Sequence, residues 1–291
     1  MTMEFSKTIE ELIDSLDVKI PAKEKFLELS KIFVINPIKD VNPNFERGIL
    51  LYSLISKYRP KNVLEIGTAE GFSALCMAWA MTDCKINGKI FTIDPKPFDL
   101  PKKRINTWDE NGKNEFVSLS TKELWTKFAK KEWLEKIEIL TGYSGEILHK
   151  LSKQLPNMDM GYIDGHHAYT AVRHDFHAFL KNSSENFILL FDDYHTQDVS
   201  KLIDDEIKPN FDTTIISTNA HKQRKIPSNS ENDIRMCFIQ SNSIRQPFEQ
   251  IFPKNKSEQI INEYVKWEKR WKLRNSINQK LPFLKKIKFS R

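Results

Sequence analysis

Five short apolar segments, each ending close to a glycine or an aspartate and followed by a helical pattern, constrain the fold more than any other feature. The segments cover 62–66, 89–93, 137–140, 158–163 and 186–191. Strands that alternate with helices favour a mostly parallel sheet with both faces covered. Two last strands, at 213–216 and 234–239, have no helix between them, so one strand near the end of the sheet must be antiparallel. The sequence therefore predicts an α/β, doubly wound, mostly parallel seven-stranded sheet.

Length and charge suggest how this sheet domain is flanked. The 291 residues fit one large α/β domain with terminal extensions. We expect a helical N-terminal extension at 1–43, the sheet domain at 44–241 and a basic, partly helical C-terminal extension at 242–291. The segment 254–291 carries a charge of +9, which leaves −3 on the rest of a chain whose net charge is +6. This distribution argues against a uniformly basic nucleic-acid-binding protein.

The chain carries no sign of export or of a membrane span. No apolar run approaches the roughly 20 residues that cross a bilayer. The N-terminus lacks the basic and apolar regions of a secretory signal. Cys76, Cys84 and Cys237 have no CxxC spacing and are typical of reduced thiols. We expect a cytoplasmic protein, and the basic extension leaves contact with the inner membrane surface open.

The loop after the first predicted strand has the form of a ligand-binding turn. Gly67 has no Cβ to obstruct a ligand, and Gly71 allows the next helix to pack closely. The helix that follows offers free N–H groups at its N-terminus to an anionic group. The spacing Gly-x-x-x-Gly differs from the Gly-x-Gly-x-x-Gly of dinucleotide-binding dehydrogenases. A tight turn without any ligand is the other alternative.

Two further strand ends extend the predicted ligand site. Asp94 ends the second strand, where a carboxylate can accept hydrogen bonds from both hydroxyls of a ribose. Its alternative role is to cap the loop that begins at Pro95. Ser144 follows the third strand and is expected near an adenine, although it suits a helix N-cap equally well.

Carboxylates and histidines gather after the fourth and fifth strands. Asp164, Asp192 and Asp193 are expected to lie side by side and to surround one hard divalent cation. Without a cation, three close carboxylates would repel one another. His167 is the predicted general base, and His166 is its competitor.

Other histidines of this stretch are interpreted differently. His174 and His177 share a helix face but lack the further ligands of a closed zinc site, so a solvated face is expected. His195 is expected to help line the pocket of the predicted ligand site.

Three segments together resemble a known family. They are Glu65-Ile66-Gly67-Thr68-Ala69-Glu70-Gly71-Phe72-Ser73, Asp164-Gly165-His166-His167-Ala168-Tyr169 and Asp192-Asp193-Tyr194. The chain resembles, over about 44–240, class I S-adenosylmethionine (SAM)-dependent methyltransferases, and among them the metal-dependent enzymes that methylate sugar hydroxyls in macrolides and aminocoumarins. Relatives in that group are often labelled cephalosporin hydroxylase.

The resemblance implies a Rossmann-like methyltransferase fold, SAM as cofactor and Mg²⁺ or another divalent cation as metal. It implies Asp164, Asp192 and Asp193 as metal ligands, with the base at His167 or His166. The residues expected at the cofactor are Glu65, Gly67, Thr68, Gly71, Ser73, Asp94, Ser144 and Asp164. The chain departs from the family after the third strand, where Gly142-Tyr143-Ser144 stands in place of Gly-Asp-Ser.

The expected activity is methyl transfer from SAM to a hydroxyl of a sugar or similar polyol, with the metal binding the acceptor oxygen. The alternatives are a metal-dependent hydroxylase, which favours a site of two histidines and one carboxylate, and a non-catalytic protein that binds a partner through its basic tail.

The C-terminal extension has an aromatic stripe. Ile260, Ile261, Tyr264, Trp267 and Trp271 recur at three- and four-residue steps, with basic residues among them. The first interpretation is a helix that docks this stripe on the body. The second is contact with an anionic membrane surface or a lipid-linked glycan. Nucleic acid is not expected as a partner, and homo-oligomers are left open.

Overall fold

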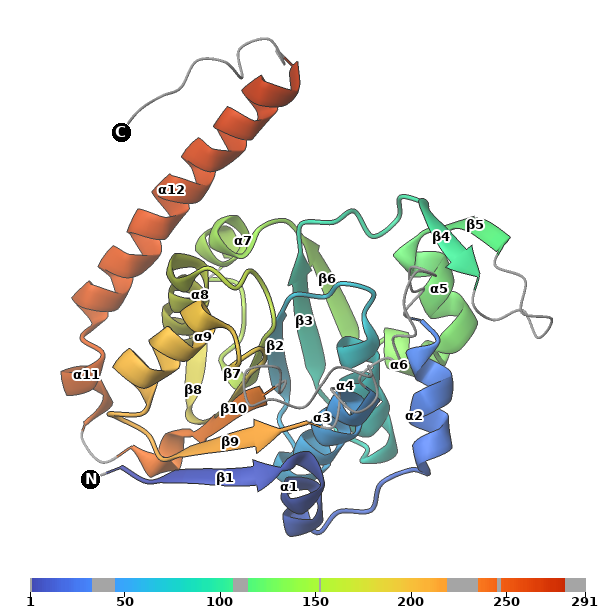
Figure 1. Ribbon diagram of the computed structural model, residues 1–291, viewed down its shortest axis with the longest axis horizontal. Helices are drawn as coiled ribbons and strands as arrows, with labels where there is room; N and C mark the ends of the chain where they lie inside the picture. Colours follow the sequence, from blue (N-terminus) through green and yellow to red (C-terminus); the bar gives the residue numbers. More distant parts are fainter. Residues whose placement is uncertain are drawn as a thin grey trace.

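The computed structural model describes residues 2–32, 45–106, 115–151, 153–218, 235–244 and 247–280. Its centre is an eight-stranded sheet with the order β1-β9-β10-β8-β7-β2-β3-β6 (Figure 1). The strands are β1 (Glu4–Thr8), β2 (Asn62–Ile66), β3 (Lys89–Asp94), β6 (Ile137–Thr141), β7 (Met158–Ile163), β8 (Ser183–Phe191), β9 (Thr213–Ser217) and β10 (Arg235–Gln240). This is the expected doubly wound, Rossmann-like methyltransferase fold.

The direction of the last strands confirms the antiparallel element. β10 pairs antiparallel with both β8 and β9, whereas β2 pairs parallel with β3 and β7. The connection between β9 and β10 contains residues 219–234, which lie outside the described part of the chain. The strand order reverses direction between β2 and β7, so the carboxyl ends of these two strands open a crevice for a ligand.

The sheet has one strand more than the sequence predicted. β1 pairs parallel with β9, from Glu4 opposite Thr213 to Thr8 opposite Ser217. Most side chains of β1 are exposed. The strand was missed because it buries no apolar face of its own and joins the sheet through its backbone.

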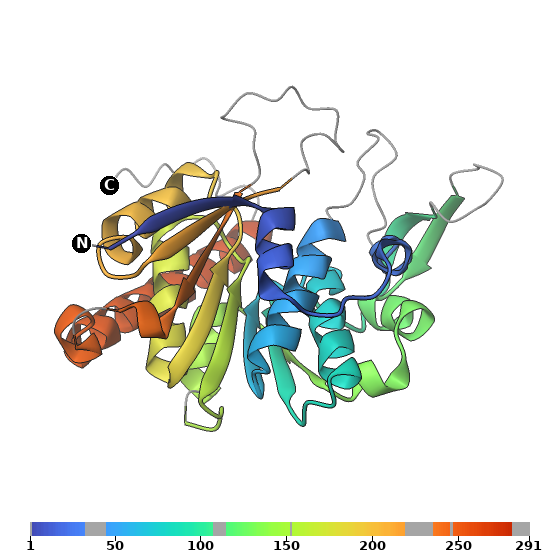
Figure 2. The same ribbon diagram turned by 90° about the horizontal axis from the view of Figure 1, so that it is seen from below.

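Helices cover both faces of the sheet, and Figure 2 shows the blue N-terminal helices and the orange-to-red C-terminal helices on opposite sides. On one side lie α1 (Ile9–Leu16), α2 (Lys23–Ser30), α3 (Phe45–Tyr58), α4 (Phe72–Asp83), α5 (Thr121–Phe128) and α6 (Lys131–Leu134). On the other lie α7 (Ser144–Leu151), α8 (Tyr169–Asn182), α9 (Gln197–Leu202), α11 (Phe248–Ile251) and α12 (Lys254–Lys280). Alternate strand residues divide between the two cores: Val63 enters the first and Leu64 the second.

The stretch 96–119 between β3 and α5 has no clear apolar period, which predicts a long loop, but the structure differs. It contains an antiparallel hairpin of β4 (Lys102–Asn106) and β5 (Glu115–Leu119). Residues 107–114 between them are outside the described part. Ser120 and Glu123 have capping-box spacing, which predicts a helix from there to about 135. The box forms, but the helix breaks after Phe128 into α5 and α6.

The C-terminal extension forms one long helix that lies against the body. α12 contacts α8 and α7 (Figure 1). Its residues Ile260, Ile261, Tyr264 and Val265 are buried against the body. The docked interpretation therefore describes Ile260, Ile261 and Tyr264, whereas Trp267 and Trp271 of the same stripe stay 46% and 37% exposed. Residues 281–291 lie outside the described part of the chain. Within the described part, no helix is long and apolar enough to cross a membrane.

Candidate active site

The carboxyl ends of the central strands surround a cavity of about 420 Å³. Its wall is built from the loop after β2, the ends of β3, β6 and β7, and one face of α12. Of the residues predicted at the cofactor, the cavity is lined by Gly67, Asp94, Ser144 and Asp164. Its volume lies within the roughly 300–1,000 Å³ typical of small-molecule sites. We call it the cofactor cavity.

Gly67 is required by both its backbone conformation and its surroundings. Its φ of +105° is rarely adopted by residues with a side chain, and a Cβ at this position would stand 2.0 Å from the carbonyl oxygen of Asp164. The Gly67 N–H donates to the carbonyl of Ile93 at 2.9 Å, and the Asp164 N–H donates to the carbonyl of Ile66 at 2.8 Å. The glycine thus lets the ends of β2, β3 and β7 meet at one point.

Asp94 is held in place by backbone hydrogen bonds. Its Oδ2 accepts the N–H of Ala69 and its Oδ1 accepts the N–H of Lys96, both at 2.8 Å. Each carboxylate oxygen keeps a lone pair for a further donor. A fixed carboxylate in the cavity wall is suited to accept hydrogen bonds from two neighbouring hydroxyls.

Four other residues predicted at the cofactor do not line the cavity. Glu65, Thr68 and Ser73 are buried beneath the loop. Ser73 Oγ donates to Glu65 Oε1, Thr92 Oγ1 donates to Glu65 Oε2, and Thr68 Oγ1 lies 2.5 Å from Thr92 Oγ1.

Gly71 supports the loop from its far end. At its φ of +86°, a Cβ would collide with the ring of Trp125. We interpret Glu65, Thr68, Gly71 and Ser73 as residues that position the loop. Burial raises the pKa of Glu65 to about 7, although the hydrogen bonds from Ser73 and Thr92 oppose this shift.

The carboxylates of Asp164 and Asp192 share two partners that were not identified from the sequence. Arg47 of α3 forms ion pairs with both, at 3.0 Å to Asp164 Oδ2. The Tyr162 hydroxyl lies 2.7 Å from Asp192 Oδ2 and 3.1 Å from Asp164 Oδ2. Arg47 is a basic residue in an otherwise largely apolar helix, which was the available signal. The guanidinium relieves part of the repulsion between these carboxylates, for which the sequence analysis considered only a metal ion.

The surroundings of Asp164 shift the pKa of its carboxyl strongly. Burial and the neighbouring Asp192 raise its pKa well above the usual range, while Arg47 opposes the shift. This carboxyl also lines the cofactor cavity, so it connects the cavity with Asp192 and Asp193, which together with Asp164 we call the acidic cluster.

Asp193 pairs with the predicted base. Its Oδ2 lies 2.7 Å from His167 Nε2. This hydrogen bond raises the pKa of His167, although partial burial opposes the effect. Burial opposes ionisation of Asp193, yet the bond to His167 leaves the pKa of this carboxyl below its ordinary value. The backbone of Asp193 is left-handed at a φ of +56°, and its N–H donates to Asp192 Oδ1 at 2.8 Å. The two adjacent aspartates therefore point in different directions.

The geometry groups the possible metal ligands differently from the predicted triad. Asp164, His167 and Asp193 each place one ligand atom within 4.8 Å of the others. Asp192 is 3% exposed and directs its Oδ2 to Arg47 and Tyr162. The predicted ligands Asp164 and Asp193 thus come together with His167 in one group, whereas Asp192 is placed behind it.

The remaining histidines fall into two sets. His166 lines the cofactor cavity, and His195 Nε2 lies 3.7 Å from Asp193 Oδ1. His174 and His177 are buried, so the expectation of a solvated face is wrong. His177 bonds to Ser257 and Glu206, and the ring of His174 stacks on Tyr264, because α12 covers this face of α8.

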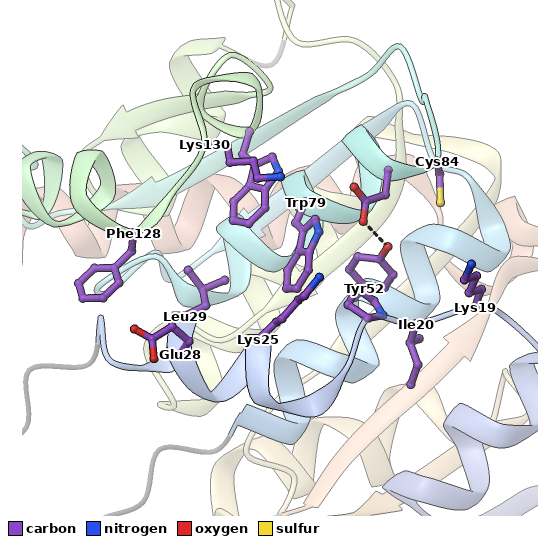
Figure 3. A pocket seen from close by; sticks show the side chains of 13 residues that line it. Lys19, Ile20, Lys25, Glu28, Leu29, Tyr52, Trp79, Cys84, Phe128 and Lys130 are labelled. Atoms are coloured by element: carbon purple, nitrogen blue, oxygen red, sulfur yellow. Dashed lines mark hydrogen bonds between the residues drawn. The ribbon is translucent and has the colours of Figure 1, made fainter.

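A second cavity, of about 710 Å³, lies between α2, α3, α4 and the segment of α5 and α6 (Figure 3). Tyr52 donates a hydrogen bond to Asp83 there, and Trp79 stacks on Trp133. Asp83 ends α4, whereas the loop from Gly67 to Gly71 precedes this helix. The second cavity is therefore at the opposite end of α4 from the acidic cluster, and we do not assign the active site to it.

Comparisons with known proteins give a sequence match to part of the chain and similar folds. Residues 64–194 match the family model described as a methyltransferase domain. No curated protein matches the chain. A putative O-methyltransferase from Klebsiella pneumoniae is 17% identical and covers 81% of this chain and 96% of its own, with a TM-score of 0.50. An O-methyltransferase from Bacillus cereus, solved with S-adenosylhomocysteine (SAH), is 17% identical over 80% of this chain and 99% of its own, with a TM-score of 0.49. The matched segment contains the glycine loop, Asp94 and the carboxylates Asp164, Asp192 and Asp193, so residues 64–194 are similar in sequence to a methyltransferase domain.

Proposed function

We propose that this protein transfers the methyl group of SAM to a hydroxyl oxygen of a sugar or a similar small polyol. One observation carries the proposal: the Asp193–His167 pair and Asp164 lie together where Asp164 also lines the cofactor cavity. A proton acceptor beside the methyl donor is what an alcohol needs in order to act as a nucleophile, because its hydroxyl proton must leave.

The reaction is a single displacement. The acceptor oxygen forms a bond to the methyl carbon while the carbon–sulfur bond breaks, and SAH leaves with the electron pair of that bond. The hydroxyl proton passes to a base on the protein. The cavity walls contribute by holding the oxygen in line with the methyl–sulfur bond.

Within this scheme the cofactor residues divide into two roles. Asp94 accepts the ribose hydroxyls, and Gly67 allows the cofactor to approach the backbone at the end of β2. Glu65, Thr68 and Ser73 fix the loop from below.

His167 is the base that the hydrogen bonds support best. Asp193 orients its ring and stabilises the protonated form, as the 2.7 Å contact and the raised pKa indicate. His166 is the neighbouring alternative, because it lines the cofactor cavity and only its Nδ1 is engaged, by the N–H of Ala168.

A divalent cation fits the same group of residues. Two carboxylates and one imidazole within 4.8 Å form a donor set that Mg²⁺ or a related ion accepts. Asp164, His167 and Asp193 would hold it, and a bound ion would favour the ionised form of an acceptor hydroxyl. An imidazole nitrogen that binds a metal cannot take a proton, so with a metal present the role of base falls to His166.

The hydroxylase alternative is less well supported. Non-haem iron oxygenases use two histidines and one carboxylate, whereas the group found among the described residues has one histidine and two carboxylates. The sugar class of acceptor rests on the resemblance of the sequence motifs. The loops 96–119 and 219–233 are expected to shape its pocket, and of these residues 107–114 and 219–233 lie outside the described part.

The proposal is tested by methyl transfer from SAM labelled in its methyl group. Purified protein is incubated with a panel of glycosides that carry free hydroxyls and with matched amines as controls. We expect label in an ether-linked methyl group and none in the amines, and we expect Asp94→Asn to weaken SAH binding. Label on nitrogen, or no heat of binding with SAH at millimolar concentration, would refute the proposal.

A further inference from the structure

The C-terminal helix reaches the cofactor cavity from outside the matched methyltransferase segment. Four of its residues line the cavity opposite Gly67 and Asp94: Tyr264, Trp267, Glu268 and Trp271. Positions 264, 267, 268 and 271 lie on one face of a helix, because three- and four-residue steps return to the same side. One continuous face of α12 thus forms a wall of the cavity.

The aromatic residues of this face form a ladder. The ring of Tyr264 stacks on His174 at 4.4 Å between centroids, Trp267 lies 5.4 Å from Tyr264, and Trp271 lies 6.2 Å from Trp267. The interplanar angles of these three contacts are 28°, 31° and 21°, so the rings are nearly parallel. Trp267 and Trp271 remain 46% and 37% exposed. Two half-exposed indoles at a cavity mark a place where a flat apolar ligand group can bind.

The helix is fixed to the body at this point. Lys272 forms an ion pair with Glu146 of α7, and its ammonium lies 4.3 Å from the ring centroid of Tyr143. Tyr143 also contacts Trp271 edge to face at 5.6 Å. The wall is therefore connected to the loop after β6, which supplies Gly142, Tyr143 and Ser144 to the same cavity.

Glu268 is a buried carboxylate that faces the first turn of α7 and Lys272. The residue is 1% exposed, and the backbone N–H groups of Gly145 and Glu146 stabilise its charge, although among the described residues neither oxygen accepts a hydrogen bond of full geometry. Its closest cation is Lys272 at 3.7 Å. Both oxygens lie against Gly145 in the first turn of α7, at 3.0 Å from the place of a Cβ. A carboxylate oxygen has more than one lone pair, so Glu268 can accept a further donor from the cavity that it lines.

We propose that α12 completes the cofactor site: its Trp267 and Trp271 rings stack on the adenine of SAM, and Glu268 accepts the hydrogen bond of the exocyclic amino group. This inference rests on the proposed function, because it takes SAM as the occupant of the cavity. Adenine fits the chemistry of the wall, since it has a flat face for the indoles and an N–H donor at its edge. The adenine-binding residues of this protein then come from a helix outside the residues 64–194 of the methyltransferase domain.

The first test is calorimetric titration with SAH. The double variant Trp267→Ala/Trp271→Ala should bind SAH at least about 10-fold more weakly, which is the scale of base–aromatic stacking. Leu273→Ala is the matched control, because Leu273 is an exposed apolar residue of the same helix that does not line the cavity. Both variants should keep the thermal unfolding midpoint of the wild type. Unchanged affinity in the double variant would overturn the inference.

The second test addresses Glu268 and separates it from a purely structural role. Wild-type protein should prefer SAH over S-inosylhomocysteine, whose base carries a carbonyl in place of the amino group, by about 10-fold or more. Glu268→Gln should lose most of this preference, since an amide can donate to the carbonyl as well as accept. If Glu268 only caps α7, the substitution will lower the affinity for both ligands equally and the preference for SAH will persist. That result would overturn the assignment of Glu268 to the amino group of adenine.

These tests also distinguish the inference from the proposed function. A wild-type protein that does not bind SAH refutes the function itself. A wild-type protein that binds SAH while the α12 variants bind it equally well refutes only the inference.

Discussion

Glu65 gives the site a pH-dependent stability that can be measured directly. Its carboxyl is fully buried and its pKa is raised to about 7, compared with 4.5 for an ordinary glutamate. Between these two values the unfolded chain is ionised while the folded protein holds a proton. The stabilisation is therefore present in full below pH 4.5 and is lost as the pH rises through 7.

The size of the effect follows from the shift. Each pKa unit corresponds to 1.36 kcal/mol, so Glu65 alone should reduce the free energy of unfolding by about 3 kcal/mol between pH 4.5 and pH 7. Glu65→Gln removes the titration and keeps the hydrogen bonds, because an amide can accept from Ser73 and donate to Thr92 Oγ1, which can in turn donate to Thr68. The free energy of unfolding of the variant should be close to that of the wild type near pH 5 and higher than that of the wild type above pH 7.

The assay is urea unfolding of wild type and Glu65→Gln at pH 5, 6, 7 and 8. The control is Glu138→Gln, an exposed glutamate on the nearby strand β6. The control should follow the wild-type pH dependence, whereas the difference between Glu65→Gln and wild type should grow by about 2–3 kcal/mol from pH 5 to pH 7. Superimposable pH profiles for all three proteins would refute the reasoning about Glu65.

Four further predictions follow from the site. Gly67→Ala should lower the free energy of unfolding by about 3 kcal/mol or more, because its Cβ meets Asp164 and its φ is positive, whereas Ala69→Gly relieves a positive φ and should be tolerated in the same unfolding assay. His167→Ala should reduce turnover by about 10²–10⁴-fold with little change in SAH affinity, because His167 either takes the proton or holds the metal, and a silent His167→Ala would disprove both roles. Excess EDTA should abolish methyl transfer while calorimetry still detects SAH binding, and full activity in EDTA would disprove the metal requirement. Deleting residues 280–291 should leave SAH affinity unchanged, and equal cosedimentation of the truncated and intact proteins with anionic liposomes at low salt would disprove the alternative of a membrane-surface contact through this segment.

The sequence predicted the sheet well because its signals are local. The five short apolar segments became β2, β3, β6, β7 and β8, and a helix follows β2, β6, β7 and β8 as predicted. Only β3 is followed by an element that was not predicted, the β4–β5 hairpin. Thr8 with Glu11 and Ser120 with Glu123 stand at capping-box spacing in the sequence, and both boxes form. In contrast, β1 joins the sheet through backbone pairing with β9, a contact across about 200 residues that leaves no periodic pattern in either segment.

The site was predicted less completely, for a related reason. Residues that follow the strands, such as Asp94 and Asp164, could be placed because parallel strands end at one edge. Arg47 could not, since its ion pairs with Asp164 and Asp192 span more than 100 residues. The different directions of Asp192 and Asp193 depend on a left-handed φ at Asp193, which aspartate adopts only occasionally and which the sequence does not reveal.

The N-terminal strand has a consequence for how the protein behaves in solution. Without β1, the outer edge of the sheet would be β9, which contains buried Ile215 and Ile216 and would offer unpaired backbone groups to another chain. β1 occupies those groups and places Glu4 and Lys7 at the new edge. Charged side chains on an edge strand discourage pairing between molecules. A polar segment that contributes little to either core thus protects the sheet against edge-to-edge aggregation, and an affinity tag is better attached at the far end of the chain.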